Sequence, residues 1–363
     1  MVRIYLRALV GYEYANDVRN SDTLCLGRLS PDPRACQVHR KDRFTRFAEG
    51  EPTLPIFMQP WWLDATAGPS GWDVAIVEQD GRIVAALPYV ERRLLHWRLL
   101  GQPPLTQHLG PWLAPQTGKR TTRYTNEHKL LTSLLESLPK ASRYLQNWSP
   151  ERMNHLPFHW VGHEATVSYT YVIDYRDDDF ETGIDSRIRN DLKKAKNRFG
   201  VEPVEKADID EFIRLHRLTF DRQKIAMPYS LDLIRRIDAA CAARNARTMF
   251  FAGDGNGTAA AATYVIWDER SAFYLMAGSD PDRRHLGAGT VALWEAVKKM
   301  KDRTERFNFE GSMIKPIEGH FRRYGGRRVP YLSVKGTSSF TLQCAESLRT
   351  SARRLRRSTS DSP

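Results

Sequence analysis

The order of apolar segments in the second half of the chain constrains the fold more than any other feature. The expected elements, in chain order, are two amphipathic helices, three strands, and then helix, strand, helix and strand, at residues 209–223, 230–245, 247–254, 259–268, 271–280, 290–301, 306–311, 317–326 and 329–336. Strands that alternate with helices in this way are typical of an α/β domain built on a central mixed sheet. A strand at 165–175 and a basic helix at 185–200 precede this series.

The length of the chain predicts two domains. At 363 residues it exceeds the roughly 250–300 residues at which a single core stops growing. We expect a loose N-terminal leader, two domains and a basic Ser/Arg-rich tail, at residues 1–43, 44–164, 165–337 and 338–363. In the first domain, Gln79-Asp80-Gly81 predicts a hairpin turn, Pro88 predicts a strand edge or bend, and the leucines of 121–138 predict a helix.

The charge of the chain points to an anionic partner. The net charge is +12, so a phosphorylated cofactor, a nucleic acid or a membrane surface are all candidate partners. The basic helix at 185–200 could contact a polyanion or could be a solvated face. No apolar run approaches the ~20 residues that span a bilayer, and the first residues do not form a signal peptide, so a cytoplasmic protein is expected.

Metal ligation is not expected. The four cysteines contain no CxxC pair. His155, His159 and His163 recur every four residues, but Pro157 and Gly162 interrupt them, which predicts a strand and a turn there.

The strongest local motif lies between the strand at 271–280 and the helix at 290–301. It consists of Arg284 and two glycines, Gly287 and Gly289, in the pattern RxxGxG. Glycines let a backbone approach a ligand closely, and the first amides of a helix lack partners, so the turn predicts an anion site. The residues expected to hold a diphosphate are Arg284, His285, Leu286, Gly287, Ala288, Gly289 and Thr290.

This motif resembles the pyrophosphate-binding motif of the GNAT acyltransferase superfamily. FNFEGSM (307–313), HFRRYGG (320–326), RIRNDLKKAKNRFG and FDRQKIAMPYS resemble a GNAT subgroup related to the Fem peptidoglycan aminoacyltransferases. The similarity covers residues 165–335 well and 50–160 more weakly. It implies two GNAT-like domains, each a mixed sheet flanked by helices, with a degenerate N-terminal copy that carries no second RxxGxG.

The resemblance also implies a reaction, the transfer of an acyl group from a thioester or ester to an amine. In that family the strand before the phosphate loop, here 273–279, splays from its neighbour and polarises the donor carbonyl. The strand end at 306–311 makes Glu310 the first candidate base, with Ser312 beside it, although a helix-capping or salt-bridged role would also account for Glu310. Asp280 is either the second candidate base or simply part of a turn. The position of the family's usual acidic tyrosine holds Phe321, and Tyr324 is expected on a different helix face, so the leaving-group acid is open.

Acceptor recognition is expected where the helix at 209–223 breaks before Pro228. Arg222, Gln223 and Tyr229 could line an acceptor pocket there, or they could simply face solvent. Trp61 and Trp62 are either part of a ligand platform or part of the core.

Three functions remain open. The first is an N-acyltransferase that uses acyl-coenzyme A as co-substrate without a permanently bound cofactor. The second is a Fem-like aminoacyltransferase that uses aminoacyl-tRNA to modify a peptidoglycan precursor or another amine. The third is a non-catalytic protein that binds a polyanion. The acceptor, a small molecule or a peptide or sugar amine, is not defined by the sequence.

Overall fold

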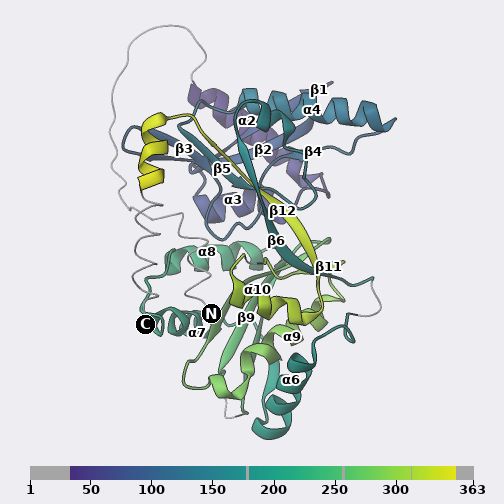
Figure 1. The fold of residues 1–363 in the computed structure, drawn as a ribbon, viewed down its shortest axis with the longest axis vertical. Helices are drawn as coiled ribbons and strands as arrows, with labels where there is room; N and C mark the ends of the chain where they lie inside the picture. Colours follow the sequence, from purple (N-terminus) through teal and green to yellow (C-terminus); the bar gives the residue numbers. More distant parts are fainter. Residues whose placement is uncertain (1–32, 177–179, 256–257, 312, 349–363) are drawn as a thin grey trace. The chain divides into compact units, whose positions relative to one another are not determined.

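The structure is a computed structural model that describes residues 33–176, 180–255, 258–311 and 313–348 (Figure 1). The described residues fall into two compact units, one of residues 168–330 and the other of residues 33–167 with 331–348. Strands β6 (Glu164–Asp174) and β12 (Arg327–Thr337) contribute residues to both units. No helix in the described part of the chain is both long and apolar enough to cross a membrane.

The unit that contains residues 33–167 is built on a mixed sheet. Its strand order is β1-β2-β3-β5-β12, with β4 paired to β2. The further strands and helices of this unit are β1 (Trp72–Gln79), β2 (Arg82–Leu94), β3 (Trp97–Gly101), β4 (Trp112–Leu113), β5 (Arg143–Asn147), α2 (Pro33–Glu49), η1 (Ile56–Met58), α3 (Pro60–Ala67), α4 (Arg120–Ser137) and α5 (Leu156–Trp160). The expected leucine helix is α4, whose Leu130, Leu131 and Leu134 are buried in the core of the unit.

The β1–β2 hairpin confirms the predicted turn, and Pro88 lies at a local strand edge, as expected. Asp80 and Gly81 both have positive φ, 50° and 74°, as a tight two-residue hairpin requires. Pro88 lies inside β2, paired with Val74 of β1. On the other side of β2, β4 pairs only with residues 85–86 and β3 only with residues 90–94, so Pro88 falls in the gap, where no ladder N–H is needed.

Ordered helices occur at both ends of the expected domain plan. Helix α2 begins at Pro33, inside the expected leader, because proline is favoured in the first turn and Phe44 anchors the helix in the core. The expected tail also begins with ordered structure, since residues 340–348 are helical and Glu346 forms ion pairs with Arg143 and Lys335. Residues 1–32 and 349–363 lie outside the described residues.

The histidine segment also differs from the expectation. Residues 156–160 form the short helix α5, which Pro157 starts rather than interrupts. No group of three His, Cys, Asp or Glu side chains suited to a metal ion occurs among the described residues.

The unit of residues 168–330 carries the motif region. Its sheet has the order β6-β11-β10-β9-β8-β7. The further elements are α6 (Ser186–Phe199), β7 (Glu202–Glu205), α7 (Ile209–Asp221), α8 (Leu231–Ala242), β8 (Arg247–Gly253), β9 (Ala261–Trp267), β10 (Ala272–Ser279), η2 (Arg284–Leu286), α9 (Ala288–Met300), β11 (Arg306–Asn308), α10 (Lys315–Phe321) and η3 (Arg322–Tyr324). All neighbours in this sheet are antiparallel except β10 and β11, so the predicted α/β class with a mixed sheet is confirmed.

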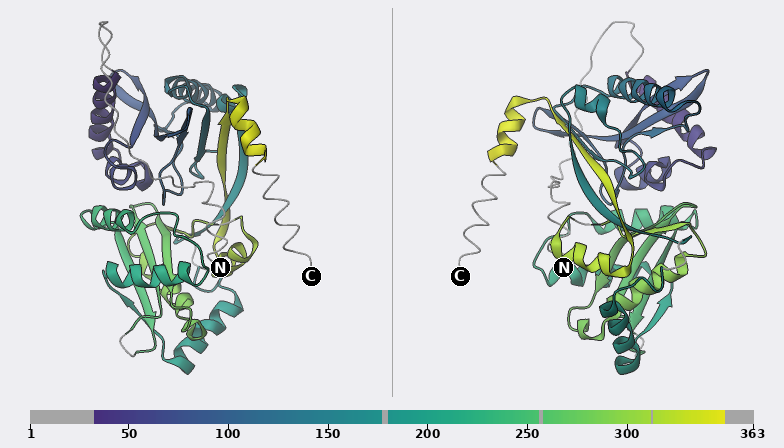
Figure 2. Two further views of the ribbon diagram at one scale, coloured as in Figure 1. Left: turned by 90° about the vertical axis from the view of Figure 1, so that its left-hand side faces the viewer. Right: turned by 45° about the vertical axis from the view of Figure 1, so that its right-hand side comes forward.

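Helices cover both faces of this second sheet (Figure 2). Tyr264 of β9 packs against Phe212 of α7, whereas the next residue, Val265, belongs to the core that contains α9 residues such as Leu293. Successive strand residues point to opposite faces, so α7 and α9 lie on opposite sides of the sheet. The RxxGxG turn therefore connects β10, which contacts both α7 and α9, to the N-terminus of α9.

Candidate functional site

The RxxGxG turn forms a short 3-10 helix, η2, followed directly by α9. Gly287 has φ 74° and forms the N-cap of α9, a left-handed conformation that favours glycine. The amides of Thr290 and Val291 donate to the Gly287 carbonyl. The amides of Ala288 and Gly289 precede these first intrahelical donors, so they are available at the helix N-terminus.

The side chains of the loop divide into exposed and buried ones. Arg284, His285 and Gly289 are exposed, whereas Leu286 packs in the core and can contribute only its backbone. Helix α6 supports the turn from behind, since a Cβ on Gly287 would lie 3.5 Å from Ala195 Cβ. The open side of the turn therefore presents main-chain N–H groups and one arginine.

A second arginine lies beside this turn. Arg222 is the C-cap of α7, and its pKa is lowered by burial and then by the nearby charge of Arg284. Two guanidinium groups that repel each other next to unpaired helix amides form a region of concentrated positive potential. This arrangement is suited to an anion that carries more than one charge.

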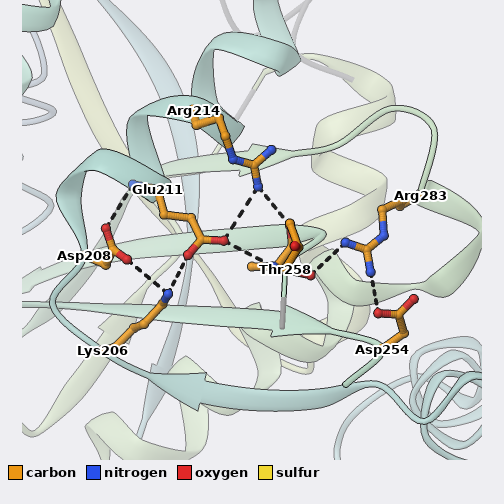
Figure 3. Close-up of polar contacts among 8 residues, drawn as sticks. Lys206, Asp208, Glu211, Arg214, Asp254, Thr258 and Arg283 are labelled. Carbon is orange, nitrogen blue, oxygen red and sulfur yellow. Dashed lines mark hydrogen bonds and ion pairs between the residues drawn. The ribbon is translucent and has the colours of Figure 1, made fainter. Parts of the chain in front are cut away.

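The segment before the turn is held by a polar network (Figure 3). Arg283 donates to the Thr258 carbonyl at 2.7 Å and to Asp254 at 2.5 Å. Next to Thr258, the Ala259 amide donates to Glu211, which also pairs with Lys206 at 2.5 Å. These contacts connect α7, the β8–β9 loop and the residue before Arg284, and so fix the entry to the turn.

Strand β10 diverges from β11 near the turn. The parallel pairing of the two strands covers only Ala272 and Phe273, while β10 stays paired with β9 up to Ser279. The Asp280 amide donates to the Ala260 carbonyl, and Gly278 faces β9 in the same way, because the register is regular from Met276 to Ser279. The N–H and carbonyl of Ala277 therefore point to the opposite edge, where β11 has left the sheet. The expected splay of the strand is present.

Helix α7 supplies partners on this open edge. His216 Nδ1 lies 2.7 Å from the Ala277 carbonyl, and Ser279 donates its N–H to Thr219 Oγ1 at 2.9 Å. His216 Nε2 lies 3.0 Å from the hydroxyl of Tyr229. Tyr229, which the sequence assigned to the acceptor, is thus bonded to a residue that the sequence did not single out.

Gln223 lies one residue after Arg222, at the end of α7. Its Nε2 donates to the Thr219 carbonyl at 2.9 Å. Its Oε1 is buried and has no hydrogen-bond partner within the described residues. A buried acceptor without a donor is unfavourable by about 1–3 kcal/mol, so this atom is suited to accept a hydrogen bond from a ligand.

Glu310 follows β11 in a constrained position. Its φ is 57°, it is 3% exposed, and its N–H donates to Asn308 Oδ1 at 2.8 Å. Burial raises the pKa of its carboxyl well above the ordinary value. A carboxyl that burial keeps protonated can donate its proton, and the role of Glu310 as a base stays a prediction.

Within its described residues, the structure gives no catalytic contact for the other two candidates, Asp280 and Ser312. Asp280 Oδ1 accepts the N–H of Asp282 at 3.0 Å, as in a turn, which agrees with the simpler of its two interpretations. Ser312 lies outside the described residues.

Tyr324 lies beside Thr290, in the first turn of α9. Residues 322–324 form a 3-10 turn, and both Phe321 and Tyr324 contact Phe309. Residues three apart eclipse each other in a 3-10 helix, so the expectation of a different face was wrong. Tyr324 is buried, its pKa is raised by burial, and its hydroxyl bonds to the Thr290 side chain.

The two tryptophans lie in the other unit. Trp62 is fully buried and donates its indole N–H to Thr106 at 2.9 Å, so it is a core residue. Trp61 is partly exposed and packs edge-on against Trp62.

Sequence reasoning missed two residues at this site. His216 and Thr219 look like ordinary helix residues in the sequence, and only the packing of α7 against β10 shows their contacts. A signal for His216 did exist, because a histidine on the apolar face of an amphipathic helix needs a buried partner.

The comparisons with known proteins concern this region and the fold around it. Residues 184–311 match the family described as an acetyltransferase (GNAT) domain. No curated protein matches the sequence. The fold resembles a crystal structure of FemX, with a TM-score of 0.59 and 10% identity over 80% of this chain and 95% of FemX.

Two further solved structures share the fold. One is a conserved protein of unknown function from Bacteroides thetaiotaomicron VPI-5482, with a TM-score of 0.52 and 12% identity over 82% of this chain and 96% of that one. The other is the C-terminal domain of a putative lysylphosphatidylglycerol synthetase from Agrobacterium fabrum, with a TM-score of 0.51 and 12% identity over 82% and 92%. At these identities the likeness shows the fold alone.

Proposed function

We propose that this chain, which carries a GNAT-type acetyltransferase domain at residues 184–311, transfers an acyl group from acyl-coenzyme A to an amine in the cytoplasm. The observation that carries the proposal is the approach of Arg222 and Arg284 beside the free amides of Ala288 and Gly289. A diphosphate between them would relieve the repulsion and accept the helix amides.

The proposed site assigns each group a task. Ala277 would donate its N–H to the donor carbonyl, since it faces the open edge of β10. Gln223 Oε1 would accept an N–H of the acceptor amine. Positioning of this kind can supply effective molarities of about 10⁵–10⁸ M, more than the ~10²–10⁴ of one proton-transfer group.

The proposed chemical step is a direct transfer. The amine nitrogen attacks the thioester carbonyl carbon, the new C–N bond forms and the C–S bond breaks. Glu310 gives its proton to the departing sulfur and takes one from the amine nitrogen, so the carboxyl ends the cycle protonated.

Donor binding is the direct test of this function. Calorimetry with acetyl-coenzyme A should give a binding signal that Arg284→Ala and Arg222→Ala each weaken about tenfold or more, the scale of one charge-assisted hydrogen bond. Arg235→Ala is the matched control, because Arg235 of α8 pairs with Asp210 in the first turn of α7, at the opposite end of that helix from Arg222. No heat with the unaltered protein would overturn the acyl-coenzyme A assignment.

The basic surface of α6 favours aminoacyl-tRNA as the alternative donor. Six cations of this helix are exposed and have no ion-pair partner within the described residues: Arg187, Arg189, Lys193, Lys194, Lys196 and Arg198. At 3.6 residues per turn they form two rows that flank the buried stripe of Ile188 and Ala195.

A filter-retention assay with tRNA separates the two donors. If tRNA is the donor, replacing the six cations with glutamine should weaken retention and flatten its salt dependence, because fewer counterions are released. Neutralising Lys119, Arg120 and Arg123, which are exposed on and beside α4 in the other unit, is the control. Equal loss in both variants would indicate unspecific charge attraction and would exclude α6 as a donor site.

A further inference from the structure

Helix α7 touches the backbone of β10 at Gly278. A Cβ on Gly278 would lie 2.5 Å from the His216 amide nitrogen and 2.6 Å from the Leu215 carbonyl carbon. Only a residue without a side chain permits this approach. The helix therefore contacts the strand directly on the stretch where β11 no longer pairs with it.

Two α7 side chains bond to the peptide groups on either side of Gly278. His216 reaches the Ala277 carbonyl, and Thr219 Oγ1 accepts the Ser279 N–H. Since a carbonyl can only accept, Nδ1 of His216 carries the proton, and Nε2 accepts the hydroxyl proton of Tyr229. The ring is thereby fixed in one tautomer and one orientation.

The surroundings of His216 keep the ring neutral and immobile. It is 4% exposed, and it stacks against Phe212 and Tyr229 with interplanar angles of 19° and 13°. Burial lowers its pKa to about 4. A neutral, fully packed imidazole with both nitrogens bonded is suited to hold a neighbour in place rather than to exchange protons with substrate.

We propose that His216 and Thr219 are positioning residues that fix the open edge of β10, and that Tyr229 orients His216 for this task. This inference rests on the proposed function. The two hydrogen bonds hold the Ala277 carbonyl and the Ser279 N–H in place, so the Ala277 N–H stays directed at the donor carbonyl. Misplacement by about 1 Å can lower a rate about 10²-fold.

Two pairs of variants separate this role from simple packing. His216→Asn keeps an N–H donor near the Nδ1 position, whereas His216→Gln places its polar end near Nε2 and leaves the Ala277 carbonyl unbonded. Thr219→Ser keeps the hydroxyl, whereas Thr219→Val removes it at similar volume. We expect His216→Gln and Thr219→Val to lower kcat at least tenfold while the Kd for coenzyme A changes by no more than about twofold. The conservative variants His216→Asn and Thr219→Ser should keep kcat within about threefold of that of the unaltered enzyme.

A second readout does not depend on activity. Amide hydrogen exchange of residues 274–280 should accelerate in His216→Gln and Thr219→Val and remain unchanged in His216→Asn and Thr219→Ser. Equal exchange and equal kcat within each pair would overturn the proposal. If the exchange pattern holds while the unaltered protein transfers no acyl group, the clamp stands and the proposed function fails.

Discussion

The buried carboxyl of Glu310 should make the stability of the protein depend on pH. Its folded-state pKa is raised, so its contribution to stability is complete below the unfolded value of about 4.3 and is lost as pH rises through the folded pKa. Glu310→Gln has nearly the same shape and cannot ionise. We expect the variant to match the unaltered protein in denaturant midpoint at pH 4.5 and to exceed it at pH 9.

The same substitution tests the proposed chemistry. If Glu310 moves the proton, Glu310→Gln should lower kcat about 10²-fold while the fold is preserved. A variant that loses stability at every pH would show instead that the carboxyl serves as a hydrogen-bonding group in the core.

Buried histidines have the opposite pH dependence. Burial lowers the pKa of His216 and of His320 to about 4, and Arg323 contributes to the shift at His320. Since the unfolded chain binds these protons near pH 6.5, the stability from neutral histidine is complete above pH 6.5 and is lost as pH falls toward 4. Between pH 7 and pH 4.5 the free energy of unfolding should therefore fall less in His216→Asn than in the unaltered protein, by on the order of 1–3 kcal/mol. Urea titrations at the two pH values measure this difference. An unchanged slope would contradict the neutral buried ring.

At the scale of an element, the turn before α9 allows binding to be separated from stability. Gly289 is exposed, and a Cβ there would meet only Ala261 Cβ at 4.0 Å. Gly289→Ala should thus leave thermal stability unchanged or slightly higher, while its methyl group obstructs the approach of a phosphate and weakens coenzyme A binding about tenfold or more.

The neighbouring glycine provides the contrast. Gly287→Ala places a side chain at φ 74°, which destabilises by roughly 1–2 kcal/mol, so this variant should lose both melting temperature and donor affinity. Thermal melts measure the stability of the two glycine variants, and calorimetry measures their affinity for coenzyme A. If Gly289→Ala binds coenzyme A normally, the diphosphate does not use this turn, and the non-catalytic polyanion-binding function gains support.

At the scale of the whole molecule, one unit depends on a segment from the far end of the chain. Residues 333–337 of β12 pair with residues 143–147 of β5. A chain that ends at residue 330 should therefore lose ordered packing in the unit of residues 33–167. Seven of the nine tryptophans lie in that unit, so the truncation should shift tryptophan emission to the red, whereas a chain that ends at residue 348 should not.

The sequence by itself determined the elements and the motif of the second unit. Apolar periodicity predicted α7, α8, α9 and the strands β8 to β10, because local side-chain pattern decides whether a segment can bury one face. The basic helix expected at 185–200 is α6, and its caps, Asp185 and Gly200, are local hydrogen bonds and local backbone angles. The RxxGxG turn could also be predicted, because Gly287 meets a local requirement for positive φ.

Only the tertiary structure decided how the site is assembled. The clamp of His216 on β10, the approach of Arg222 to Arg284, the contact of Tyr324 with Thr290 and the buried state of Glu310 all join residues far apart in the chain. The short strand β7 escaped prediction for the same reason. Pairing partners and burial depend on the packing of distant segments, and no local pattern encodes the distance between two such segments.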